Sequence, residues 1–258
     1  MSAGKSQRKR VGARAEGTAF RRVSPARLCA FEILRRVEDE GAFASVLLAE
    51  TDEEMLAADR ALCYELVLGV LRRQLWLDHL IEHFTGRASE QLDAPVSRAL
   101  RLGLYQLRFL TRVPPSAVVN EAVNLAYRSR VSSAAGFINA VLRRALKEPE
   151  YDPAQSLTDP FERLSVETSH PRWLIERWAK AFGRDATEEF AHANNETPGI
   201  AFRVVAARSK GRDVLEELRA AAEELSSSEI AQGAWRIRGA GALVRKLAQA
   251  GLIYVQDE

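Results

Sequence analysis

The chain has 258 residues, of which 47% are hydrophobic and 28% charged, and its formal net charge is +2. This length and composition are ordinary for a soluble protein with one large domain or two smaller ones and a real hydrophobic core. The longest uncharged run, residues 131–142, is too short to span a bilayer, and no apolar stretch follows the basic N-terminus, so we expect neither a membrane span nor a secretory signal.

Basic residues gather in two separate blocks. Residues 1–23 are rich in Arg, Lys, Gly, Ser and Ala with little apolar content, which predicts a disordered basic tail. Residues 1–28 hold eight Lys and Arg against one acidic residue, and residues 95–147 hold nine against the single Glu121. Two such blocks suit a polyanion such as RNA, because phosphates attract them regardless of sequence, although a solvated face with a tail has the same charge pattern.

Residues 24–147 show helical periodicity and no strand pattern. Ser24 before Pro25, and Ser116 after a double proline, are typical of helix N-caps. Leu100, Leu104, Leu107 and Leu110 predict one buried stripe along their helix. Five long helices and one short one are expected, at about 24–40, 42–49, 59–84, 95–110, 116–126 and 137–147.

The remaining chain has a different pattern. Pro149, Pro153 and Pro160 mark residues 148–168 as a linker. The sequence then predicts helices at about 171–180, 185–194, 212–225 and 243–250, and strands at about 200–206, 235–238 and 252–255. The fold class is therefore mainly α, with a helical bundle followed by a small α+β subdomain at 169–258.

Two blocks of the bundle carry a family resemblance. They read GLYQL at 103–107 with VPPSAVVNEAV at 113–123, and GFINAVLRR at 136–144. Gly103 would let two helices approach closely, and Glu121 is placed to cap or bridge to a neighbour. Together the blocks make residues 24–147 resemble the NusB-type RNA-binding domain, in the version that precedes RsmB/Sun-type 16S rRNA (cytosine-5-)-methyltransferases. The resemblance implies a NusB-like helical bundle that binds RNA.

The resemblance also implies where RNA binds. An arginine-rich N-terminal segment helps to bind RNA in the family, and this chain has Arg8, Lys9, Arg10, Arg21, Arg22 and Arg27 in that region. Guanidinium groups match phosphate geometry well. The second basic block adds Arg101, Arg108, Arg112, Arg128, Arg130, Arg143 and Arg144. We predict these thirteen residues as RNA-binding, although a solvated surface role is the simpler interpretation of any one of them.

A second resemblance covers the C-terminal part. HPRWL at 170–174, the residues Asn194-Asn195, Pro198 and Arg203, and GLIYVQDE at 251–258 are similar to the segment that follows the bundle in the same methyltransferases. This implies a small subdomain at 169–258 that precedes a catalytic domain and helps to hold RNA. The family's catalytic domain itself, with its S-adenosylmethionine pocket and two cysteines, has no counterpart in this sequence.

Chemistry-bearing residues are otherwise sparse. Cys29 and Cys63 follow leucines on apolar helical stretches, where cysteine usually packs in a core, and they lack metal-ligand spacing. His79 and His83 are four apart on a helix, but Glu82 is the one carboxylate between them. We therefore predict no catalytic, cofactor-binding or metal-binding residues in this chain, and expect S-adenosylmethionine only together with the missing catalytic domain.

The sequence thus predicts a cytoplasmic RNA-binding chain that positions ribosomal RNA, of the small subunit, as the N-terminal part of an rRNA cytosine-5 methyltransferase. It is not expected to be catalytic alone. Two alternatives stay open: a transcription antitermination factor that binds nascent RNA and a ribosomal protein, and a protein–protein interaction module. A separately encoded methyltransferase domain is a further possible partner.

Overall fold

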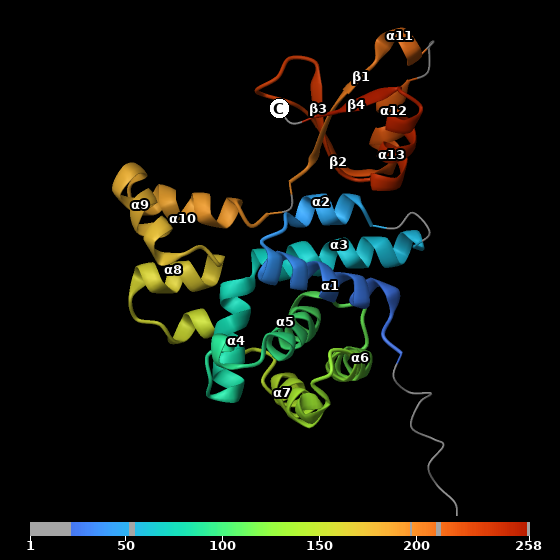
Figure 1. Ribbon diagram of the computed structural model, residues 1–258. Coiled ribbons are helices and arrows are strands. Elements are labelled where there is room, and N and C mark those ends of the chain that lie inside the picture. The colour runs from blue at the N-terminus through green and yellow to red at the C-terminus, as the bar shows by residue number, and fades with distance from the viewer. Residues whose placement is uncertain (1–21, 52–54, 197, 210–212, 257–258) are drawn as a thin grey trace, which may run out of the picture. The chain divides into compact units, whose positions relative to one another are not determined.

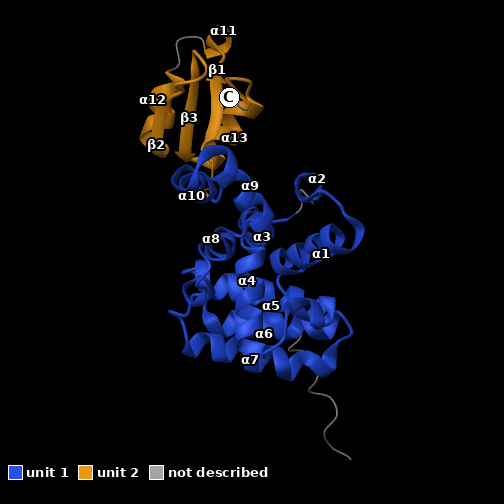
Figure 2. Cartoon of the chain, turned by 90° about the vertical axis from the view of Figure 1, so that its left-hand side faces the viewer, with its two compact units in different colours: residues 1–195 blue, residues 196–258 orange. Residues whose placement is uncertain are grey.

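The chain forms two compact units. The computed structural model describes residues 22–51, 55–196, 198–209 and 213–256. Contacts divide the chain into Met1–Asn195 and Glu196–Glu258, coloured separately in Figure 2. The first unit is helical and the second combines helices with a four-stranded sheet, so the mainly α fold class is confirmed. Among the described helices, none has the length and apolar character needed to cross a membrane.

The predicted bundle helices are present in the first unit, with one difference. Residues 59–84 were expected to form one helix, and they form two, α3 and α4. The bundle consists of α1 (Pro25–Glu40), α2 (Ala44–Ala49), α3 (Ala57–Arg72), α4 (Gln74–Thr85), α5 (Ala94–Phe109), α6 (Pro115–Arg128) and α7 (Ala135–Lys147), with short 3-10 turns η1 (Ser89–Gln91) and η2 (Ser132–Ala134).

The break between α3 and α4 lies at Arg73, whose backbone leaves the helical region with φ −114° and ψ 18°. A distant segment satisfies the groups that the break frees. The guanidinium of Arg73 donates to the carbonyl of Glu167 at 3.1 Å, and the backbone nitrogen of Trp76 donates to the hydroxyl of Ser169 at 3.1 Å. Since these partners lie more than ninety residues away, helical periodicity alone does not predict the break.

Helix α5 is the centre of the first unit and packs against α1, α3, α4, α6 and α7 (Figure 1). Every residue from Val96 to Gln106 is buried. The predicted single stripe was too narrow: Leu100 and Leu104 are fully buried, but so are residues on the other faces, while Leu107 is only half-buried. A helix surrounded by five others has no solvent face, so its polar residues must find partners inside the protein.

Two glycines allow close helix packing: Gly103 lets α5 approach α7, and Gly69 lets α3 approach α5. A Cβ atom on Gly103 would lie 2.8 Å from the methyl groups of Leu142, which confirms the predicted close approach of two helices. A Cβ on Gly69 of α3 would lie 2.0 Å from the ring of Tyr105. The tyrosine hydroxyl then donates to Glu65 at 2.5 Å, on the same helix as Gly69. Larger residues at either glycine would separate these helices.

Serine caps behave differently from the prediction. Ser24 does precede α1, but its hydroxyl makes no capping bond to that helix. Helix α6 begins at Pro115 with Pro114 at the N-cap position, so Ser116 lies inside the first turn. Proline has its φ already near the helical value and needs no amide hydrogen at this position, which lets α6 begin one residue earlier than expected.

The segment 148–168, expected as a linker, contains ordered helical structure. Asp152 accepts from the amide of Ala154 at 3.1 Å and starts the turn η3 (Pro153–Ser156), and Asp159 accepts from Glu162 at 2.9 Å and starts α8 (Pro160–Thr168). Aspartate followed by proline is a strong helix start, so the prolines begin helices here. The first unit then continues through α9 (Arg172–Phe182) and α10 (Arg184–Ala193) to Asn195.

The second unit is a small antiparallel sheet covered by two helices. Phe202, Ile237 and Ile253 of the sheet pack with Leu218 and Leu247 of the helices in one core. The strands are ordered β2-β3-β1-β4, and each neighbouring pair is antiparallel. The elements are β1 (Ile200–Val204), α11 (Ala206–Ser209), α12 (Val214–Ala221), β2 (Ala222–Ser227), β3 (Ala234–Gly239), α13 (Gly241–Gln249) and β4 (Ile253–Val255).

Strand β2 was not predicted from the sequence. Residues 212–225 suggested one helix, but α12 ends at Ala221 and the chain pairs directly with β3, with an irregularity between Ala222 and Glu224. Leu225 is half-buried against the sheet core while its neighbours are exposed. Pairing with the following strand, β3, overrides the weak helical preference of this segment.

Candidate nucleic-acid interface

Glu121 of α6 anchors the start of α1. Its carboxylate accepts from the backbone nitrogen and the hydroxyl of Ser24, at 2.8 and 2.7 Å, and from the Arg27 guanidinium at 3.1 Å. The bridging role expected for Glu121 is therefore confirmed. Arg27 also donates to Gln106 at 2.6 Å and is buried. These bonds occupy the guanidinium, so Arg27 ties the start of α1 to α5 and α6, and only 8% of its side chain is exposed.

The basic N-terminal segment meets the protein surface at α6. The side-chain amide of Asn124 donates to the carbonyl of Arg22 at 3.2 Å, and Arg22 itself is exposed. Arg128 lies one helical turn beyond Asn124, on the same face of α6, and is exposed, as is Arg130 in the turn that follows. We call Arg22, Arg128 and Arg130 the α6 basic surface. Four predicted residues, Arg8, Lys9, Arg10 and Arg21, lie outside the described residues.

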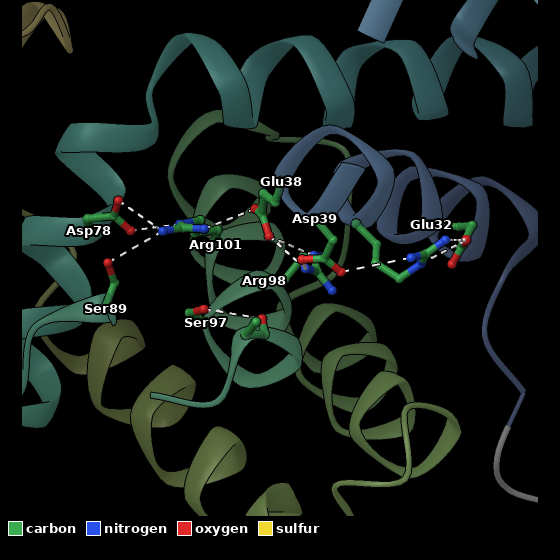
Figure 3. Close-up of polar contacts among 10 residues, drawn as sticks. Glu32, Glu38, Asp39, Asp78, Ser89, Ser97, Arg98 and Arg101 are labelled. Atoms are coloured by element: carbon green, nitrogen blue, oxygen red, sulfur yellow. Dashed lines mark hydrogen bonds and ion pairs between the residues drawn. The ribbon is translucent and has the colours of Figure 1, made fainter. Parts of the chain in front are cut away.

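Arg101 belongs to a buried ion-pair network (Figure 3). It donates to both carboxylate oxygens of Asp78, at 2.7 and 3.1 Å, and to Glu38 at 3.0 Å. Arg98, one turn earlier on α5, is 1% exposed and bonds to Glu38 and Asp39, at 2.7 and 3.2 Å. Burial raises the pKa of Asp78 despite the opposing effect of Arg101. Arg101 therefore joins α1, α4 and α5 and has no free face for RNA.

The remaining predicted arginines lie near the ends of α5 and α7. Arg108 donates to the backbone carbonyls of Glu148 and Pro149, and burial lowers its pKa. Arg144 donates to the Glu148 carboxylate and to the Phe84 carbonyl, and remains half-exposed. Arg143 is exposed and bonds only to the neighbouring Asn139 among the described residues, and Arg112 is exposed in the loop before α6. Arg108 and Arg144 thus both bond to Glu148, just after α7.

The structure thus sorts the predicted residues by their surroundings. It places the backbone of Arg22 beside Asn124 of α6, leaves Arg112, Arg128, Arg130, Arg143 and Arg144 exposed, and gives Arg27, Arg101 and Arg108 partners within the protein. Sequence reasoning missed Asn124, which fixes the path of the chain next to α6. The sequence signal that could have pointed to Asn124 was its position one helical turn before Arg128.

The histidines occupy structural positions. His83 stacks on Tyr151 with ring centroids 3.6 Å apart and bonds to Glu148 at 3.1 Å. His170 packs on Trp178 at 5.3 Å, and burial lowers its pKa. Within the described residues, no three His, Cys, Asp or Glu side chains are grouped as metal ligands would be.

Two family models match the chain. Residues 24–147 match the NusB family, and residues 170–244 match the Methyltr_RsmF/B-like, ferredoxin-like domain. The chain therefore contains a NusB-family domain followed by an RsmF/B-like ferredoxin-like domain. The second match begins within the first compact unit, since α9 and α10 pack with α8, and extends through most of the second unit.

Curated relatives with similar sequences are named as ribosomal RNA small subunit methyltransferases B. The Bacillus subtilis (strain 168) protein, described as probable, is 30% identical over 89% of this chain and 51% of its own length. The probable Synechocystis protein is 33% identical over 75% of this chain and 44% of its own length. The chain thus spans about half the length of these relatives. The solved structure of PH0851 has a similar fold, with a TM-score of 0.59 at 21% identity over 91% of this chain and 54% of that one.

Proposed function

We propose that this chain binds ribosomal RNA of the small subunit and positions it for a cytosine-5 methyltransferase, as the non-catalytic N-terminal part of such an enzyme. The NusB-family and RsmF/B-like domains support this role, as do relatives named for small-subunit rRNA methylation. Methyl transfer and S-adenosylmethionine binding are assigned to a domain outside this sequence. We keep the expectation that the protein acts in the cytoplasm.

One observation supports an RNA contact at α6. Glu121 and Asn124 hold the backbone of Ser24 and Arg22 against α6, the helix that also carries the exposed Arg128. Glu121, the single acid of residues 95–147, is occupied by Ser24 and Arg27 and does not neutralise this surface. Exposed arginines on α6, in a chain whose N-terminal residues are also strongly basic, attract phosphates through counterion release. Arg112, Arg143 and Arg144 are proposed as a second phosphate-contacting group.

The proposal is tested by measuring the affinity of the chain for a small-subunit rRNA fragment at several salt concentrations. Each phosphate contact contributes about 0.7–0.9 to the slope of log affinity against log salt. The double variant Arg128→Ala/Arg130→Ala should reduce this slope by about 1–2, and replacing Arg8, Lys9 and Arg10 together by alanine should reduce it further.

A matched control removes the same charge elsewhere. Arg35 and Arg36 on α1 are paired with acidic residues in a net acidic region, so Arg35→Ala/Arg36→Ala should leave the slope unchanged. A flat salt dependence of the unmodified chain would contradict the proposal and favour a protein–protein module. Specific binding to a ribosomal protein together with nascent RNA would favour antitermination, and methylation by the chain alone would contradict the non-catalytic assignment.

A further inference from the structure

The four-stranded sheet of the second unit has one buried face and one exposed face. Phe202, Ile237 and Ile253, on β1, β3 and β4, are buried and pack with residues of α12 and α13. Successive side chains of a strand point to opposite faces of the sheet, so the sequence neighbours of these three residues point away from the two helices. The exposed residues among these neighbours are Arg203, Arg236, Arg238 and Tyr254. We call the face that carries these four residues the open sheet face.

Strand pairing brings the four residues together. Arg203 lies directly opposite Tyr254 in the β1–β4 pair. Arg236 lies opposite Ala201, which is two positions before Arg203 on the same strand face. Residues directly opposite each other on antiparallel strands have Cβ atoms about 5 Å apart, and diagonal neighbours are about 7–8 Å apart. Arg203 therefore has an aromatic ring on one side and a second guanidinium group on the other.

The open sheet face has an excess of positive charge. On this side of the four strands, three residues are arginines and one, Glu224, is acidic. Glu224 lies opposite Arg238 and 3.9 Å from it, and Glu196 lies 3.3 Å from the same guanidinium. Exposed ion pairs of this kind are weak, so phosphate oxygens can replace these carboxylates. The charge of the face suits an anion, and the planar guanidinium group matches phosphate geometry.

Tyr254 adds an aromatic ring to this cationic face. Its side chain is 63% exposed, although the preceding residue of the strand, Ile253, is buried in the core. Unpaired bases stack on exposed aromatic side chains, and this stacking tolerates any base because every base has a π-face. Bases of a duplex are already stacked on one another, so the combination of Tyr254 and Arg203 favours single-stranded nucleic acid.

We propose that the open sheet face is a further RNA-binding site, at which an unpaired base stacks on Tyr254 while the neighbouring phosphates contact Arg203 and Arg236. This inference rests on the proposed function, because it takes RNA as the ligand, and it names a single-stranded segment as the part of the RNA that this site holds. The site lies in the second unit, whereas the α6 basic surface belongs to the first.

Affinity measurements with the whole chain test the proposal. The probes are a single-stranded oligoadenylate and an RNA duplex of the same length, each over several salt concentrations. Tyr254→Ala should weaken binding of the single strand by about 5- to 150-fold without changing its salt slope, and should leave duplex binding unchanged. Tyr254→Phe, which keeps the ring, should retain the affinity. Arg203→Ala should reduce the salt slope for the single strand by about 0.7.

Two matched controls alter equivalent side chains elsewhere. Phe182 on α9 is also 63% exposed, so Phe182→Ala removes an equally accessible ring and should leave both affinities unchanged. Arg245 is exposed on α13, one of the helices that cover the buried face, so Arg245→Ala should leave the salt slope unchanged. Circular dichroism checks that each variant is folded, and Tyr254→Leu, which keeps apolar bulk without a ring, replaces Tyr254→Ala if the latter is not.

The outcomes separate this site from the proposed function. RNA binding that depends on Arg128 and Arg130 but is unchanged in Tyr254→Ala would support the proposed function and overturn the open sheet face as an RNA site, leaving a protein partner as its occupant. An equal loss of affinity in Tyr254→Phe and Tyr254→Ala, or an equal loss for the duplex, would overturn the stacking. A chain that binds neither probe nor a small-subunit rRNA fragment would overturn both proposals.

Discussion

The carboxylate of Glu121 accepts hydrogen bonds from both the backbone nitrogen and the hydroxyl of Ser24, at 2.8 and 2.7 Å. The Glu121 side chain on α6 thereby accepts from a backbone amide at the start of α1. The hydroxyl of Ser24 makes no capping bond to that helix. The same carboxylate pairs with Arg27, whose side chain is 8% exposed. One acidic residue of α6 therefore fixes the beginning of α1 through both Ser24 and Arg27.

Replacing Glu121 by alanine should destabilise the fold by about 3 kcal/mol, because it leaves a buried guanidinium and a helix-start amide without their acceptor. Urea unfolding measures the change. Asn120→Ala is the matched control, since Asn120 is exposed on the same helix and its removal should cost less than about 0.5 kcal/mol. Equal unfolding midpoints for the two variants would show that the Glu121 bonds contribute nothing.

Gly69→Ala should destabilise the protein by about 2–3 kcal/mol, because the added methyl group displaces the ring of Tyr105 and breaks its bond to Glu65. The loss should be smaller in a Tyr105→Ala background, where the methyl group has room, giving a coupling of about 1–3 kcal/mol in a double-mutant cycle. Gly136→Ala serves as control: nothing lies within 4 Å of its added methyl, so the variant should be neutral or slightly more stable. Additive effects of the Gly69 and Tyr105 changes would contradict the packing.

Arg98→Ala should cost about 3–5 kcal/mol, because it removes a cation that is buried between α1 and α5 and is bonded to Glu38 and Asp39. Arg98 also lies over the ring of Phe31, 5.2 Å from its centroid, so Arg98→Met, which keeps the apolar contact, should cost less. Thermal and urea unfolding check the order of the two variants. Arg35→Ala, which removes an exposed ion pair on α1, should leave the unfolding midpoint almost unchanged.

The buried imidazole of His170 predicts a pH dependence. Burial lowers its pKa below the ordinary value of about 6.5, so the unfolded chain binds a proton here at a higher pH than the folded one. The stability contribution is present above pH about 6.5 and is lost as the pH falls toward the folded pKa. Unfolding midpoints should therefore decline from pH about 7.5 to 5.5, and the decline should be smaller in His170→Phe, which cannot be protonated.

His192 provides the comparison for that pH profile. It is exposed on α10, so His192→Gln should retain the decline of the unmodified protein. A His170→Phe profile that is parallel to that of the unmodified chain would assign the pH dependence to other groups.

Local patterns predicted most helices, since amphipathic periodicity and proline positions are properties of short windows. The differences arise where pairing with another segment decides the structure. Helices α3 and α4 separate at Arg73, where the Arg73 guanidinium and the Trp76 amide bond to Glu167 and Ser169, more than ninety positions away. Residues 222–227 form a strand because the following strand, β3, pairs with them.

The sequence by itself determined the helical class of the first unit, the two basic blocks and the motif that identifies the NusB-family domain. Only the tertiary structure decided which arginines are free. Arg27, Arg101 and Arg128 all lie in the two basic blocks, but Glu121 and Glu38, from 94 and 63 positions away, bind Arg27 and Arg101 inside the protein. Electrostatic partners act over a few ångströms in space, whereas sequence patterns report neighbours along the chain, so the cationic surface emerges only after folding.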